Sequence, residues 1–159
     1  MGAKTGRLEN NLVTVGTGVA AFGVWALVKY ILTAFVLNEE IEDSMEPSRL
    51  KVIYIFVFSL TLLDFLMRCF IGFSARAEGK GKNKGVFYLV ITVLLILIYA
   101  FNIVVEIIGY ITFPPALLTM VVTLLIDVTS AAMLVELFVS SVKLRKLRRL
   151  ADDSKGGTA

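Results

Sequence analysis

The chain contains no histidine and only one cysteine, Cys69, among its 159 residues. An intrachain disulfide needs two cysteines, and structural zinc sites are built mainly from cysteine and histidine side chains. The composition therefore excludes a disulfide framework, a Cys/His zinc site and a two-cysteine redox relay within one chain.

Motifs for chemistry are equally scarce. The glycines and lysines of residues 74–85 lack the spacing of a phosphate-binding loop, because Lys80 is followed by Gly81 where that loop has serine or threonine. The sequence has neither a nucleophile paired with a base nor a cluster of metal ligands. We therefore expect no enzyme activity, no metal, no cofactor and no nucleic-acid partner.

Charged residues are also few, and apolar residues dominate. The chain is 57% hydrophobic and 18% charged, and its mean hydropathy is +0.83. A soluble domain of this size has no means of burying so much apolar surface. Four apolar runs, each longer than the roughly 20 residues that cross a hydrocarbon core, cover residues 12–37, 52–73, 86–113 and 116–142. They predict an all-α fold, an integral membrane four-helix bundle whose first partner is the lipid bilayer.

The segments outside this single transmembrane domain, residues 12–142, are polar. Residues 1–11 form a short N-terminus in which Asn10 and Asn11 are suitable N-caps for the first helix. Residues 74–85 are typical of a flexible basic linker. Residues 143–159 form a basic juxtamembrane segment, followed by a tail that we expect to be disordered.

Two prolines separate the last two apolar runs. Pro114 and Pro115 leave so short a connection that the third and fourth helices must be antiparallel neighbours. With residues 38–51 as the loop between the first two helices, the bundle is predicted to consist of two antiparallel hairpins.

The first helix has two different faces. Small residues and a leucine line one face, which suits close contact with another helix: Gly16, Ala20, Gly23 and Leu27. A bulkier set shares roughly the opposite side: Gly18, Phe22, Trp25 and Lys29.

Basic residues predict the orientation. The N-terminus has Lys4 and Arg7, residues 74–85 hold four bases and residues 143–159 hold six, whereas residues 38–51 hold only two. Cytoplasmic segments carry the excess of lysine and arginine, so both termini are predicted to be cytoplasmic. The basic tail also suits anionic lipid headgroups, although a topology signal is the simpler interpretation.

One face of the third helix is more polar than the rest. Its members follow heptad spacing, typical of a helix face packed against neighbours: Tyr88, Thr92, Leu95, Tyr99, Asn102, Glu106, Gly109 and Phe113. We refer to these residues as the polar seam. A helix that is apolar elsewhere is expected to turn such a seam toward other helices.

Six ionisable residues lie within the apolar runs: Lys29, Asp64, Arg68, Glu106, Asp127 and Glu136. Because each costs at least about 2.5 kcal/mol at the bilayer centre, such residues normally face protein, form pairs and mark function. Lys29 and Glu106 lie at matching depth with opposite charge, which predicts a buried pair. Asp64 and Arg68, four residues apart, are able to pair along one helix.

Asp127 is left without a cation by this pairing scheme. Together with Asp64 and Asn102, which lie near its level, it is the predicted site for a proton or cation. Thr123 and Ser130 are the neighbours of Asp127 along its own helix face.

Two functions fit these features. The sequence slightly favours a structural or accessory membrane subunit, whose charged seam docks its own hairpins or the helix of a partner protein. The alternative is a small carrier or channel, a homo-oligomer that uses the midplane carboxylates to couple to a proton or cation. The subunit is preferred because so short a chain, without an extramembrane domain, rarely forms a complete gated carrier by itself.

Overall fold

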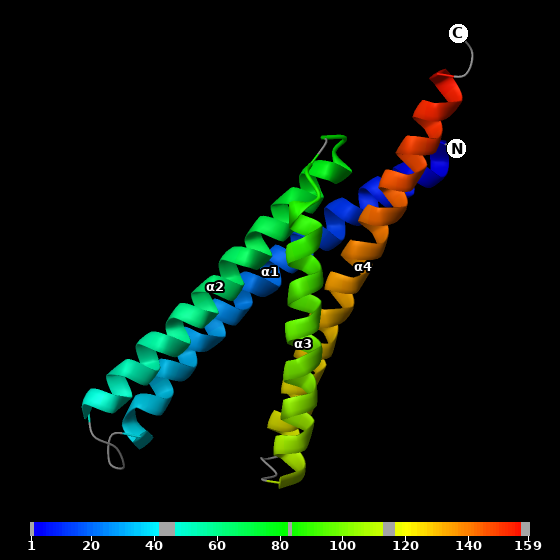
Figure 1. The fold of residues 1–159 in the computed structure, drawn as a ribbon. Helices are drawn as coiled ribbons and strands as arrows, with labels where there is room; N and C mark the ends of the chain where they lie inside the picture. The colour runs from blue at the N-terminus through cyan, green and yellow to red at the C-terminus, as the bar shows by residue number, and fades with distance from the viewer. Residues whose placement is uncertain (1, 42–46, 83, 113–116, 157–159) are drawn as a thin grey trace.

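The protein is all-α in the part of the chain that the computed structural model describes, residues 2–41, 47–82, 84–112 and 117–156, with side chains described within 5–32, 51–82, 84–112 and 120–151. Four helices follow one another (Figure 1): α1 (Gly2–Ile41), α2 (Pro47–Gly79), α3 (Phe87–Thr112) and α4 (Leu117–Gly156). Each contains a segment long and apolar enough to cross a membrane. The predicted all-α fold with four such helices is confirmed.

α1 is longer than the apolar run that predicted it. It begins at Gly2, so Asn10 and Asn11 lie inside the helix and their prediction as N-caps is wrong. A buried stripe explains the extension, because Leu8, Leu12 and Val15 follow helical spacing and pack in the core. The stripe continues the helix into the polar N-terminus.

α2 continues through the first half of the predicted flexible linker. Ile71, Ala75 and Glu78 are buried at helical spacing, so this face of the helix remains in contact with protein as far as Gly79. Gly81 then ends the helix with φ 86°, a conformation that glycine adopts without steric cost. Lys82 N donates to Ala77 O at 3.1 Å and Gly81 N to Glu78 O at 3.0 Å, the hydrogen bonds of a Schellman motif.

α4 likewise continues past the membrane-length run, as far as Gly156. The tail from residue 151 is therefore helical over much of the length that we expected to be disordered. Leu134, Leu137 and Leu144 are buried and keep α4 attached to the bundle beyond residue 142. The predicted turn at Pro114 and Pro115 lies outside the described residues.

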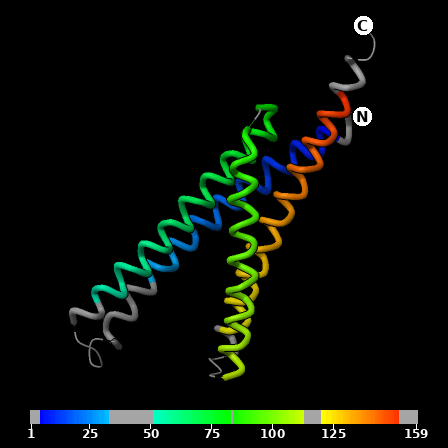
Figure 2. The backbone as a smooth tube through the Cα atoms, in the orientation of Figure 1, coloured from blue at the N-terminus to red at the C-terminus, as the bar shows by residue number. Residues whose placement is uncertain are grey.

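The helices form two pairs, α1 beside α2 and α3 beside α4 (Figures 1 and 2). The N-terminal half of α1 also packs against the C-terminal half of α4. From there the two pairs diverge. We define the closed end as residues 5–20, 68–82, 84–95 and 130–151, and the open end as residues 21–32, 51–67, 96–112 and 120–129.

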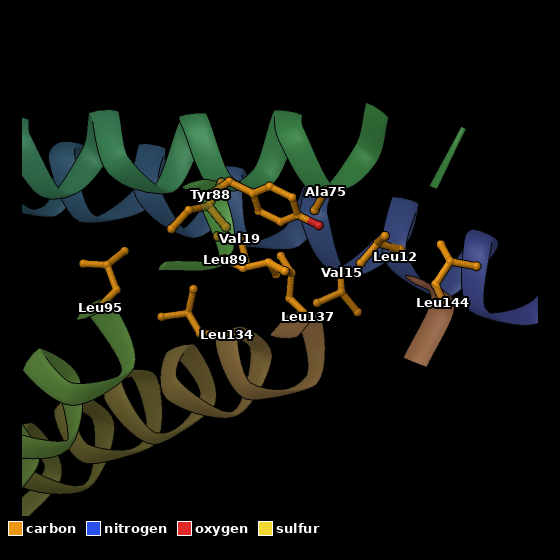
Figure 3. Close-up of a cluster of buried hydrophobic side chains, with 11 residues drawn as sticks. Leu12, Val15, Val19, Ala75, Tyr88, Leu89, Leu95, Leu134, Leu137 and Leu144 are labelled. Carbon is orange, nitrogen blue, oxygen red and sulfur yellow. The ribbon is translucent and has the colours of Figure 1, made fainter. Parts of the chain in front are cut away.

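The hydrophobic core occupies the closed end. Its buried members come from all four helices and lie along the space between them (Figure 3): Leu12, Val15, Val19, Ile71, Ala75, Tyr88, Leu89, Leu95, Leu134, Leu137 and Leu144. The open end contributes none of them, so the same chain is packed like a soluble domain at one end and divided at the other.

The small-residue face predicted for α1 makes the close contact with α2. A Cβ atom on Gly16 would lie 2.8 Å from the carbonyl oxygen of Gly72, and one on Gly72 would meet the backbone of Gly16 and Ala20. Gly23 similarly leaves room for Arg68. The prediction of a close-contact face is confirmed for Gly16, Ala20 and Gly23.

Candidate ligand-binding cleft

A cleft lies where the two helix pairs diverge. It encloses about 660 Å³ and is lined by side chains from all four helices. Ligand sites in proteins typically measure 300–1,000 Å³ and combine apolar walls with a few converging polar groups. The polar or charged residues in its lining include Lys29, Thr61, Asp64, Arg68, Tyr99, Asn102, Asp127 and Ser130.

Asp64 and Arg68 form an ion pair in the wall contributed by α2. Arg68 Nε donates to Asp64 Oδ2 at 2.9 Å, across the expected spacing of four residues. Arg68 also hydrogen-bonds the hydroxyl of Tyr99 on α3, and its guanidinium carbon lies 4.6 Å from the centre of that ring. The Arg68 side chain is 4% exposed. Its charge is therefore compensated by Asp64, and the pair connects α2 to α3.

Glu106 and Asp127 are neighbours in the second helix pair. The two carboxyl groups interact electrostatically, and Lys29 is the cation that acts on Glu106. Glu106 Oε2 is buried and has no hydrogen-bond partner among the described residues. Within that same part of the chain, Asp127 forms no salt bridge. Two carboxyl groups therefore lie together on this side of the cleft.

Lys29 is exposed and lines the cleft from α1, on the same helix face as Phe22 and Trp25. Among the described residues it forms no salt bridge, with Glu106 or with any other acid. α1 and α3 do not pack directly on each other in the described segments, although Lys29 acts on Glu106 electrostatically. The predicted Lys29–Glu106 pair therefore stays a prediction.

Most of the polar residues selected from the sequence meet at this cleft. Asp127, Asp64, Asn102, Lys29 and Arg68 all line it, and Glu106 adjoins it through Asp127. Ser130, predicted as a neighbour of Asp127, is buried in the same lining. In the described part of the chain, no group of three or more histidine, cysteine, aspartate or glutamate residues is arranged to hold a metal ion.

A second polar cluster was not predicted from the sequence. At the closed end, Arg145 Nε donates to Glu78 Oε1 at 2.7 Å and Arg145 Nη2 donates to Glu78 Oε2 at 2.8 Å. Tyr88 donates its hydroxyl proton to Glu78, and its oxygen lies 3.0 Å from the hydroxyl oxygen of Ser141. We refer to Glu78, Tyr88, Ser141 and Arg145 as the Glu78 cluster. It joins α2, α3 and α4 through a buried carboxylate.

Further polar contacts attach α1 to α4 at the same end. Arg148 Nη2 donates to Glu9 Oε1 at 2.9 Å, and Asn11 Nδ2 donates to Glu136 Oε1 at 3.0 Å. Glu136 thus belongs to the closed end and contributes nothing to the cleft. The helical spacing of Ile71, Ala75 and Glu78 was the signal that could have revealed the cluster from sequence.

No protein-family model matches this chain, no curated protein matches its sequence, and no solved structure matches its fold. The cleft is therefore the feature from which a function is inferred.

Proposed function

We propose that the chain is a multi-pass membrane protein that acts as a small carrier coupled to a proton or cation, with its cargo held in the cleft. One observation supports this over the other functions. Ionisable side chains in membrane-length helices, Lys29, Asp64, Arg68 and Asp127, line a cavity shared by all four helices. Such residues in membrane proteins commonly mark the path of an ion or substrate.

Asp127 and Glu106 are the proposed coupling residues. Neighbouring carboxylates repel each other, and a proton or monovalent cation bound between them relieves that repulsion. Asp64 and Asn102 are assigned supporting roles. The charge of Asp64 is already balanced by Arg68, and Asn102 offers a neutral amide on the α3 wall.

The proposed orientation puts the closed end and both termini in the cytoplasm. Exposed bases support it, because they gather at the closed end: Arg7, Arg76, Lys80, Lys82, Lys84, Lys143, Lys146 and Arg149. The acids among them are engaged internally, Glu78 with Arg145 and Glu9 with Arg148. The same surface suits anionic lipid headgroups, and the cleft then opens toward the outer side.

Proton movement in reconstituted vesicles tests the carrier. Vesicles containing a pH-sensitive dye receive an inward gradient of sodium, choline or glycine betaine. Wild-type protein should move protons in response to at least one of these solutes, and Asp127→Asn should abolish the response. Glu136→Gln, on the same helix but outside the cleft, is the matched control and should behave as wild type. Wild-type vesicles indistinguishable from protein-free vesicles, or an active Asp127→Asn variant, would overturn the proposal.

A second candidate, an accessory subunit, is favoured by the polar seam of α3. Tyr88, Thr92 and Leu95 are at most 2% exposed, so this half of the seam is covered by the chain itself. Asn102 is exposed, and a Cβ atom on Gly109 would meet nothing within 4 Å. A helix of a second copy or of another membrane protein would fit this uncovered half.

Purification in mild detergent, followed by mass measurement of the intact complex, separates the two candidates. Under the subunit proposal, a second copy or another protein should be present in fixed ratio. Gly109→Leu should release it, because the leucine has room within the single chain but not beneath a docked helix. A single chain with normal proton movement would exclude the subunit.

A further inference from the structure

We propose that the cargo of the cleft is a zwitterion, a small molecule that carries one cationic and one anionic group. Its anionic group would bind Lys29, and its cationic group would bind Asp127 and Glu106. This inference rests on the proposed carrier function and specifies the class of solute that it moves.

The charges that remain uncompensated in the cleft are the first argument. Asp64 and Arg68 neutralise each other. Lys29 and the Glu106–Asp127 neighbours are left, and none of them forms a salt bridge among the described residues. Among the described residues the cleft therefore has a positive group on α1 and a carboxyl group on α4 that are not held in salt bridges.

The position of these groups is the second argument. Lys29 belongs to α1, in the first helix pair, whereas Glu106 and Asp127 belong to α3 and α4, in the second pair. The two pairs diverge toward the open end (Figure 1). Lys29 and Asp127 line the cleft from different pairs, and Glu106 is the neighbour of Asp127. A ligand between the walls meets a cation on one side and carboxylates on the other.

A ligand with a single charge would neutralise the charged groups of only one wall. A simple cation would neutralise the carboxylates and leave Lys29 without a counter-ion, and a simple anion would do the reverse. A zwitterion instead presents a complementary charge to both walls at once.

The α1 wall also carries aromatic side chains beside Lys29. Phe22, Trp25 and Tyr30 line the cleft on the α1 wall. The hydroxyl of Tyr30 donates to the carbonyl oxygen of Tyr54 at 2.9 Å, which fixes its ring in the lining. Betaines and the phosphocholine group each carry one cationic and one anionic group, and the phosphocholine group occurs both as a free solute and as a lipid headgroup.

Trp25 provides a direct readout, because it is the single tryptophan of the chain and lines the cleft. Full-length protein in an uncharged detergent is titrated with glycine betaine and phosphocholine, and separately with choline and acetate, while Trp25 fluorescence is recorded. We expect at least one of the two zwitterions to bind ten-fold or more tightly than either singly charged compound.

Variants assign the two walls. Lys29→Met should reduce zwitterion binding to the level of choline, and Lys29→Arg should restore most of it. Lys29 is exposed and forms no salt bridge within the described residues, so its replacement leaves the fold intact. Asp127→Asn should lower the affinity for zwitterions and for choline alike, and Glu136→Gln should change neither affinity.

Mixed micelles distinguish the two sources of the ligand. A Trp25 response to phosphatidylcholine but not to phosphatidylglycerol, without a response to the free compounds, would assign the lipid headgroup. A response to free glycine betaine or phosphocholine would assign a soluble solute. Either result supports the proposal.

The inference is overturned if choline binds as tightly as both zwitterions, or if Lys29→Met leaves zwitterion affinity unchanged. The carrier proposal survives that outcome, provided that proton movement still depends on Asp127. Conversely, tight zwitterion binding without any proton movement would remove the carrier and leave a zwitterion-binding membrane protein.

Discussion

Charged side chains have different surroundings at the closed and open ends of the bundle. At the closed end, Glu78 is buried and has Arg145, Tyr88 and Ser141 around it, from two other helices. At the open end, Lys29 and Asp127 belong to different helix pairs and have no salt bridge in the described part of the chain. Buried charges that meet partners on other helices fasten a bundle, whereas charges that face a cavity are available to a ligand.

The largest expected contrast between the ends is their accessibility across the membrane. With Cys69 replaced by serine, a cysteine at Thr112 on the open end should react with an impermeant thiol reagent added to intact cells. A cysteine at Lys82 on the closed end should react only after permeabilisation. Both positions are exposed, so access to the side chain is equal. Labelling of the Lys82 position in intact cells would reverse the proposed orientation.

The next effect is loss of stability at the closed end. Arg145→Met leaves the buried Glu78 carboxylate without its cation and should lower the free energy of unfolding by about 3–5 kcal/mol. Denaturant titration in mixed micelles measures it. Asp127→Asn is the matched change at the open end and should alter stability little. Adding Glu78→Gln to Arg145→Met should recover much of the loss. Additive damage in that double variant would show that the two residues are not coupled.

Glycine substitutions sharpen the same comparison at a smaller scale. Gly72→Ala forces a methyl group against the backbone of α1 and should cost about 1–3 kcal/mol. Gly109→Ala meets open space at the other end and should be neutral or stabilising by up to about 1 kcal/mol, because alanine favours helix. Equal losses for the two variants, measured by thermal unfolding in detergent, would contradict the division into two ends.

The smallest effect is expected for Lys29 and Glu106. Because Lys29 is exposed and the two form no salt bridge, the coupling energy in a cycle of Lys29→Met and Glu106→Gln should stay below about 1 kcal/mol. Unfolding in mixed micelles supplies the four free energies. A coupling of about 3 kcal/mol would mean that the open end closes and buries the pair in solution.

Local patterns in the sequence predicted the features that depend on the geometry of a single helix. The spacing of Asp64 and Arg68 indicated their pairing, and the small residues of the first apolar run marked the face that meets Gly72. The heptad spacing from Tyr88 onward selected a helix face, whose first half is buried as expected. Each of these depends on a fixed helical period and on no knowledge of the neighbouring helix.

Features that depend on two helices, or on helix outside lipid, were not predictable in this way. Hydropathy identifies segments in contact with lipid, so the apolar run that predicted the second helix stopped before Glu78. The helix and its buried face nevertheless continue as far as that residue. Arg145 is separated from Glu78 by 67 residues, and nothing local fixes the register between α2 and α4. The divergence of the helix pairs, which turns predicted docking charges into a cleft, is likewise a property of the assembled bundle.

The uninterrupted length of α4 has a mechanical consequence. A helix of 40 residues is about 60 Å long, twice the thickness of a hydrocarbon core. Asp127 near one end and Arg148 near the other are thus attached to one stiff rod, pressed against α1 between them. A force on the C-terminal end of α4 would rotate that rod about its contact with α1. The distance between Asp127 and Lys29 would change without any contact being made at the cleft itself.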